Sequence, residues 1–142
     1  MTVEETLASV ELFSELTKAD IDRLAKVIVE RAFKAGDVIV REGELGVAFY
    51  VVAKGRVEVI KALGSGSEHV VATMGPGNFF GEMALFDNQV RSHSVRAIED
   101  TECIMLTKWD FNAELATSSS IALALLAVLA RRLRSLQDAH TH

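Results

Sequence analysis

The stretch from Phe79 to Ser92 contains the residues whose chemical types and spacing point most directly to a ligand. Glu82 follows a glycine, Gly81, and Arg91 comes nine residues after Glu82. A carboxylate accepts hydrogen bonds from a hydroxyl but repels a phosphate, whereas a guanidinium pairs with a phosphate. Backbone N–H groups at the start of a short helix after Gly81 give an anion a second contact. Glu82 and Arg91 therefore suit a ligand that carries both a sugar diol and a phosphate.

The composition is that of one globular domain without the charge of a nucleic-acid-binding protein. The chain has 142 residues, and 49% of them are hydrophobic, which is enough for a core. Its formal net charge is -5, so it lacks the basic surface expected of a nucleic-acid binder. A nucleotide phosphate requires only a few local cations, so the net charge does not exclude a small anionic ligand.

The single cysteine and the short apolar runs limit the redox chemistry and membrane association that we expect. Cys103 is the only cysteine, so no internal disulfide forms, and its strand-like surroundings favour a buried, unreactive thiol. The longest apolar run, Ile121 to Ala130, has about half the length that a transmembrane helix needs. The acidic N-terminus lacks the apolar region of a signal peptide. We therefore expect a cytoplasmic protein that does not enter a membrane.

Residues 1–29 have helical periodicity. We expect a short helix from Glu4 to Val10 and a longer one from Lys18 to Val29. Thr17 and Asp20 have the spacing of a capping box, with Asp in the usual place of Glu. Helices therefore precede the first expected strand.

Residues 30–108 consist of short β runs separated by glycine-containing turns, a pattern typical of a β-sandwich or barrel. The expected strands are 32–33, 38–40, 48–52, 57–60, 70–74, 94–98 and 103–106. A short helical turn follows Gly81, within the β segment. The predicted fold is mainly β with flanking α-helices, a β-roll or jelly-roll-like barrel.

Residues 109–138 return to helical periodicity, with a short helix expected from Asp110 to Leu115 and a long one from Ser119 to Gln137. The long helix has an apolar seam at heptad-like spacing, and a second apolar stripe beside it. The seam is Ala122, Leu126, Leu129, Leu133 and Leu136, and the stripe is Ile121, Leu125 and Val128. These two features favour a homodimer through this helix, and packing of the seam against the barrel is the alternative.

Four motifs, in order along the chain, resemble those of the cyclic nucleotide-binding domain family. They are Ala35-Gly36-Asp37, Arg41-Glu42-Gly43-Glu44-Leu45-Gly46, the hairpin from Tyr50 to Val59, and Gly75-Pro76-Gly77-Asn78-Phe79-Phe80-Gly81-Glu82-Met83-Ala84-Leu85 with Arg91 beyond it. The resemblance extends from about Leu12 to Leu136 and rests on the whole ordered set. It implies a single domain over residues 1–142, with a phosphate-binding cassette from Gly81 to Ser92.

The resemblance implies how this cassette would hold the sugar and the phosphate. Glu82 would accept a hydrogen bond from the ribose 2′-hydroxyl, and Gly81 would let the sugar approach the backbone. Arg91 would pair with the exocyclic phosphate oxygens. The hydroxyl of Ser92 and the backbone N–H of Ala84 would add further contacts to the phosphate.

The ligand that the resemblance implies is 3′,5′-cyclic AMP, with cyclic GMP left open and with no metal or other cofactor. The remaining ligand-binding residues implied are Met83 in the cassette and, against the purine, Val59, Val71 and Ala72. Which of Arg131, Arg132 and Arg134 reaches the base stays open. Binding would order the cassette, and the helices after Lys108 would repack over the purine.

The sequence departs from the family pattern at a few positions that hold no ligand-contacting group. His93 stands where a small residue is usual, and Val90 stands where many members carry proline. We expect His93 to be a satisfied or exposed side chain rather than a catalyst, and Trp109 to be a packing residue.

One alternative is that the chain is the sensor domain of a bacterial transcription regulator. Relatives of that kind join such a module to a helix-turn-helix domain. Because the sequence stops at His142, directly after the expected dimer helix, we expect no DNA binding by this chain alone.

A second alternative is a small cupin-like enzyme, because Gly75-Pro76-Gly77 also suits a small β-barrel oxygenase. Such sites need several imidazole and carboxylate ligands that converge on a metal. The four histidines are His69, His93, His140 and His142, and they form no H-x-H pair within the barrel. We therefore expect no catalysis.

Overall fold

The computed structural model describes residues 2–141, and the chain forms two compact units. One unit combines the residues up to Val27 with those from Phe111 onward, and the other runs from Ile28 to Asp110. We call them the helical unit and the β unit. Their boundaries lie within two residues of the changes in periodicity seen in the sequence. That they act as a single domain stays a prediction.

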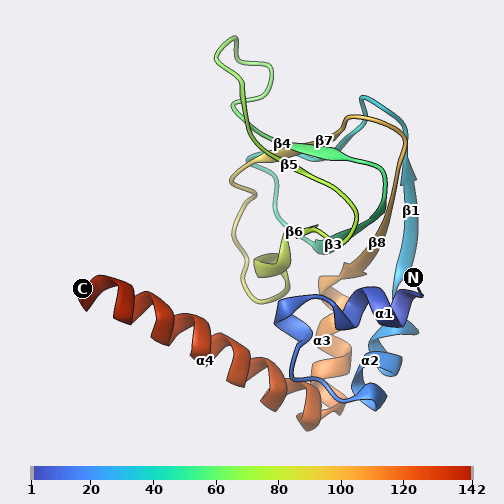
Figure 1. Ribbon diagram of the computed structural model, residues 1–142, viewed down its shortest axis with the longest axis vertical. Coiled ribbons are helices and arrows are strands. Elements are labelled where there is room, and N and C mark those ends of the chain that lie inside the picture. The colour runs from blue at the N-terminus through green and yellow to red at the C-terminus, as the bar shows by residue number, and fades with distance from the viewer. Residues whose placement is uncertain (1, 142) are drawn as a thin grey trace. The chain divides into compact units, whose positions relative to one another are not determined.

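The β unit is a sandwich of two four-stranded antiparallel sheets (Figure 1). One sheet has the strand order β1-β8-β3-β6, and the other has the order β2-β7-β4-β5. The elements are β1 (Val29–Phe33), β2 (Val38–Val40), β3 (Ala48–Lys54), β4 (Val57–Lys61), β5 (His69–Met74), β6 (Phe79–Phe80), the 3-10 helix η2 (Glu82–Leu85), β7 (Ser94–Ala97) and β8 (Thr101–Thr107). The prediction of a mainly β fold with flanking helices is confirmed.

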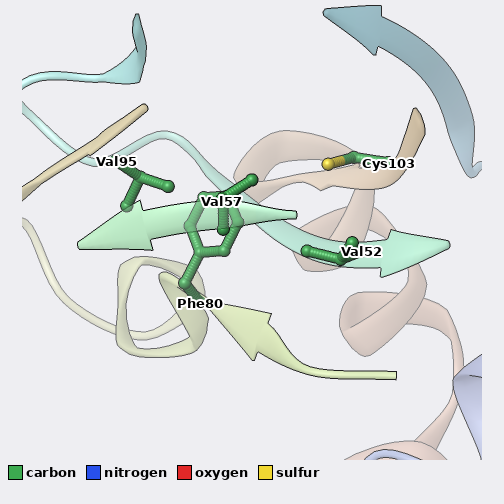
Figure 2. Packing of buried hydrophobic residues seen from close by; sticks show 5 residues of the cluster. All are labelled: Val52, Val57, Phe80, Val95 and Cys103. Carbon is green, nitrogen blue, oxygen red and sulfur yellow. The ribbon is translucent and has the colours of Figure 1, made fainter. Parts of the chain in front are cut away.

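An apolar cluster in the β unit joins side chains from both sheets. Its buried members are Val52, Val57, Phe80, Val95 and Cys103. Figure 2 shows the ring of Phe80 reaching from β6 toward Val57 of β4. Phe80 also stacks on Tyr50 with ring centroids 5.1 Å apart. Each such large apolar side chain contributes about 1.5–3 kcal/mol when it is buried, so this cluster fixes how the two sheets pack.

Cys103, the cysteine of this cluster, has an unreactive thiol. Burial raises the pKa of the Cys103 thiol to about 11, because the charged thiolate is poorly solvated there. The thiol therefore stays protonated at neutral pH, which agrees with the inert cysteine that the sequence predicts.

The helical unit contains α1 (Val3–Ala8), the 3-10 helix η1 (Glu11–Phe13), α2 (Lys18–Ala25), α4 (Ser119–Thr141) and most of α3 (Lys108–Thr117). The predicted capping box is present: Asp20 N–H donates to Thr17 Oγ1, and Thr17 N–H donates to the Asp20 carboxylate. Asp20 also accepts a hydrogen bond of 2.8 Å from Ser120, at the start of α4. The cap therefore links α2 to the long helix as well as starting α2.

Helix α4 has one buried and one exposed apolar face. Ile121, Leu125 and Val128 are buried, on a helix that packs on η1. This stripe is therefore not available for pairing with a second copy, contrary to the expectation drawn from it. The seam residues Leu126, Leu133 and Leu136 are each at least 60% exposed.

The ends of helices α2 and α4 and the exposure of Trp109 differ from expectation. Helix α2 ends at Ala25 rather than Val29, because the β-branched Val29 pairs with Met105 at the start of β1. Helix α4 continues to Thr141 rather than stopping at Gln137, and His142 lies outside the described residues. Trp109 was expected to pack but is 60% exposed.

Among residues 2–141, no single helix is both long and apolar enough to cross a membrane. Helices α3 and α4 pass that test of length and composition only as a pair, bent by 112° at the break between them.

Candidate functional site

The β unit has a cavity of about 340 Å³ at the predicted cassette. Its wall combines an apolar part from the strands with a polar part from η2 and the segment that follows it. The apolar part includes Val40, Val59, Met74, Phe79, Phe80 and Val95, and the polar part includes Glu82, Asp87, Gln89, Arg91, Ser92 and His93. A largely apolar wall with a few convergent polar groups is typical of a small-molecule site.

Arg91 is the central cation of this wall. Its side chain is half-buried, and Nη2 donates a hydrogen bond of 2.6 Å to the backbone oxygen of Ala48 on β3. Burial lowers the pKa of the guanidinium, and the neighbouring Tyr50 opposes that effect. Among the residues that the structure describes, no carboxylate forms an ion pair with Arg91. The guanidinium is therefore positioned by a neutral acceptor, and no carboxylate among the described residues neutralises its charge.

Two glycines make room for this guanidinium. Gly81, directly before η2, has φ of 80° in the left-handed region, and a Cβ there would overlap Nη1 of Arg91. A Cβ on Gly46 would lie 2.9 Å from Cβ of Ala84 and 3.2 Å from Nε of Arg91. The arginine can occupy this position only because both residues lack a side chain.

The backbone of the arginine segment is fixed by the loop between β2 and β3. Arg91 N–H donates to Glu44 O at 2.7 Å, and Gly43 N–H donates to Arg91 O at 2.9 Å. An isolated antiparallel bridge joins Leu45 to Val90. The second family-like motif, Arg41 to Gly46, therefore serves to hold the segment that carries the cation.

A charged network supports the residue after Arg91. Lys61 Nζ donates to Ser92 O at 2.9 Å and forms an ion pair of 3.0 Å with Glu42. Glu42 also accepts a hydrogen bond from Ala62 N–H, and this bond and Lys61 lower the pKa of its carboxyl. The end of β4 thereby fixes the backbone of Ser92 at the cavity.

Glu82 is half-buried, lines the cavity and is the first residue of η2. It shares the cavity wall with Arg91, so the two groups face a common space rather than opposite sides of the sandwich. The Ala84 N–H differs from expectation, because it donates to Gly81 O at 3.1 Å. This i→i+3 bond belongs to the 3-10 turn, so the N–H is not directed at an anion. Ala84 lines the cavity with its buried side chain instead.

The structure brings most of the sequence-predicted residues to one cavity but not all of them. Those that line it are Val59, Gly81, Glu82, Met83, Ala84, Arg91 and Ser92. Val71 and Ala72 are exposed on β5 and are not part of the wall, although Ala72 pairs with the wall residue Val59. A contact between these two residues and a purine stays a prediction.

Several wall residues were not among the predicted ligand-binding residues. Phe80 is buried, as expected for a core residue, yet both it and Phe79 also line the cavity. Met74 and Val95 belong to strands that the sequence did indicate, and the two-residue alternation along those strands was the available signal. His93 was singled out only as an unusual residue for its position.

Among residues 2–141, no group of three or more His, Cys, Asp or Glu side chains is arranged to hold a metal ion. The polar side chains that line the cavity include carboxylate, guanidinium, amide, hydroxyl and imidazole groups.

Comparison with known proteins agrees with this geometry. The family model described as "Cyclic nucleotide-binding domain" matches residues 30–118. The "Cyclic AMP receptor protein" of Thermus thermophilus is 39% identical over 123 residues, which cover 87% of this chain and 57% of that protein. The chain thus spans little more than half the length of this relative.

Two solved structures are similar over nearly the whole chain. The N-terminal domain of a transcriptional regulator from Streptomyces coelicolor has a TM-score of 0.88 and 31% identity, covering 95% of this chain and 94% of that one. The regulatory domain of Toxoplasma gondii PKA, crystallised with cAMP, has a TM-score of 0.73 and 26% identity, covering 94% of this chain and 49% of that one. The present chain belongs to the cyclic nucleotide-binding domain family.

Proposed function

We propose that the cavity of the β unit binds 3′,5′-cyclic AMP and that the chain is a regulatory sensor module rather than an enzyme. The observation that carries this proposal is Arg91, a half-buried cation without an ion-pair partner among the described residues, in the same wall as Glu82. A cyclic phosphate carries the single negative charge that can pair with this cation, and a ribose hydroxyl can donate a hydrogen bond to the carboxylate.

The proposed arrangement divides the ligand among three parts of the wall. The exocyclic phosphate oxygens lie at Arg91 and Ser92, and the ribose 2′-hydroxyl donates to Glu82. The purine lies on the apolar side that includes Val59. The cavity volume of about 340 Å³ falls at the lower end of the range for small-molecule pockets, which suits a mononucleotide.

A side-by-side calorimetric titration tests this function. We expect cyclic AMP to bind, with cyclic GMP as the competing candidate and 5′-AMP as the control that has the same base and sugar but an open phosphate. Tight binding of neither cyclic nucleotide, or equal binding of 5′-AMP, would contradict the proposal. Tighter binding of cyclic GMP would keep the site and change the ligand.

A conformational response of the C-terminal helices is part of the proposal, and Lys108 supports it. This first residue of α3 donates from Nζ to the backbone oxygen of Asp87, a wall residue, and at 2.6 Å to Oδ1 of Asn88. Its own N–H donates to Val47 O at 2.8 Å. Ligand binding that reorders the segment after η2 therefore acts directly on the start of α3.

Trp109, the only tryptophan, follows Lys108 and is a reporter for this response. We expect its fluorescence to change when cyclic AMP saturates the cavity, and to change less in Lys108→Met. A ligand that binds by calorimetry without any spectral change in the unmodified protein would contradict the response but not the binding.

A sensor module of a transcription regulator is the second candidate, favoured by the TM-score of 0.88 to the N-terminal domain of such a protein. A homodimer through the exposed seam of α4 belongs to this candidate, because the heptad spacing of its leucines suits an identical partner helix. Sedimentation should give a dimer that Leu133→Glu disrupts, and a monomer for the unmodified chain would contradict it. DNA binding by this chain alone is not expected, and the cytoplasmic location stays a prediction.

A further inference from the structure

His93 occupies an unusual place for a titratable residue. It is half-buried, lines the same cavity as Arg91 and Ser92, and directly precedes β7. Its ring Nδ1 lies 2.8 Å from Ser92 Oγ, which is hydrogen-bonding distance. The two side chains that follow the arginine are thus joined to each other at the cavity wall.

The direction of this hydrogen bond decides what Ser92 can offer to an anion. A neutral imidazole with its proton on Nε2 accepts at Nδ1, so the hydroxyl proton of Ser92 is used by the ring. The Ser92 oxygen then presents lone pairs, which repel a phosphate. A protonated imidazole carries N–H on both nitrogens, so Nδ1 donates to Ser92 Oγ. The Ser92 O–H is then available to donate to the phosphate.

The charged groups around His93 come from four parts of the β unit. Arg91 precedes it, and Lys61 on β4 is paired with Glu42 of the loop between β2 and β3. Glu82 of η2 and Asp87 of the following segment belong to the same wall. Because Lys61 is already paired with Glu42, a protonated imidazole at His93 adds to the positive charge of the cavity.

We propose that His93 is a further ligand-binding residue: its neutral ring carries the proton on Nε2 and accepts at Nδ1 from Ser92, and its protonation turns Ser92 into a hydrogen-bond donor toward the ligand phosphate. This inference rests on the proposed function of the cavity. It makes cyclic AMP binding tighter at lower pH, because a protonated His93 leaves the Ser92 O–H free to donate to the cyclic phosphate, which keeps one negative charge.

The test is a calorimetric titration of cyclic AMP at pH 6 and pH 8 with the unmodified protein and three variants. We expect the unmodified chain to bind about five- to tenfold more tightly at pH 6, less than a fully buried charged hydrogen bond gives because the site is partly open. His93→Gln keeps a polar side chain that does not titrate and should bind equally at both pH values. Ser92→Ala should retain only part of the ratio between the affinities at pH 6 and pH 8, because the charge of the imidazolium still attracts the phosphate.

His69→Gln is the matched control, because His69 is exposed at the start of β5 and outside the cavity wall. It should retain the full pH ratio. The inference is overturned if the unmodified protein binds equally at both pH values or if His93→Gln keeps the ratio. Absence of cyclic AMP binding at either pH overturns the proposed function itself. Melting curves of each variant without ligand, compared at both pH values, separate these results from loss of folding.

Discussion

Arg91 and Arg96 lie five residues apart in the same part of the chain, but they have opposite electrostatic surroundings. Arg96, on β7, donates from Nε and Nη2 to Glu58 at 3.0 and 2.7 Å and lies 3.8 Å from Glu68. Arg91 donates to a backbone oxygen and has no carboxylate in an ion pair among the described residues. Both side chains are only partly exposed, so burial alone does not separate them.

The difference is what we expect where one stretch of chain carries a structural cation and the cation that we propose binds the ligand. The charge of Arg96 is neutralised within the protein, so it contributes to the sheet and has little left for a ligand. The charge of Arg91 is held at the cavity by a neutral acceptor, and two glycines leave space for it. A positioned charge without an ion-pair partner in the protein is typical of a binding site, whereas a charge that is paired within the protein is typical of a structural residue.

The largest expected effect comes from exchanging the two arginines for glutamine, one at a time. Arg91→Gln should weaken cyclic AMP binding by about 100-fold, because it removes charge-assisted hydrogen bonds to the phosphate. Arg96→Gln, the matched control, should change the affinity by no more than about threefold. Calorimetry measures both. Similar losses in the two variants would erase the distinction between a binding and a structural arginine.

A second effect concerns the sugar side of the same cavity. Glu82→Gln should weaken cyclic AMP binding by about tenfold, since a neutral amide accepts a weaker hydrogen bond from the ribose hydroxyl than a carboxylate does. The unmodified protein should lose a similar factor with 2′-deoxy cyclic AMP. The two losses should not add in the combination of variant and deoxy ligand, because both remove the same bond. Additive losses would place the ribose elsewhere.

A third effect tests the space around Arg91. Gly46→Ala should lower the free energy of unfolding by about 1–2 kcal/mol and weaken ligand binding, because the new Cβ meets Ala84 and the guanidinium. Gly75→Ala is the matched control, since a Cβ there meets nothing within 4 Å and neither glycine has a left-handed φ. Chemical denaturation gives the two values, and equal stability of the variants would refute the crowding.

The smallest expected effect is a change in the pKa of Tyr50, the only tyrosine of the chain. Burial raises the pKa of Tyr50 above its ordinary value, and the positive charge of Arg91 partly offsets this shift. Arg91→Gln should therefore raise the pKa of Tyr50 further, since the tyrosinate loses a favourable cation. Arg96→Gln should leave it unchanged. Ultraviolet titration of the phenol reads this directly, and a lower pKa in Arg91→Gln would contradict the proximity of the two groups.

The sequence predicted the parts of the site that depend on local chemistry. Gly81 and Glu82 begin a short helical turn as expected, and Arg91 faces the same cavity as Glu82. The mainly β fold followed from short β runs with glycine turns between them. Each of these features is specified by residues close together in the chain, so motif and periodicity were sufficient.

The features that were missed depend on contacts between distant parts of the chain. The Ala48 oxygen that holds Arg91 lies 43 positions away in the sequence, and no residue type marks a backbone acceptor. The pairing of β4 with β5 is irregular between Val59 and Ile60, and this break is next to the region where Val71 and Ala72 were expected to face the ligand. An irregular register changes which face a side chain occupies, and alternation along one strand cannot reveal it.

All the side chains that line the cavity come from the continuous stretch between Val40 and Val95. A receptor whose contacts are encoded in one uninterrupted block can be joined to different downstream machinery without rebuilding its recognition chemistry. Apart from the contacts of Lys108 with Asp87 and Asn88, substitutions that tune affinity and substitutions that tune the response then fall in separate regions of the gene, so one can be varied while the other is kept.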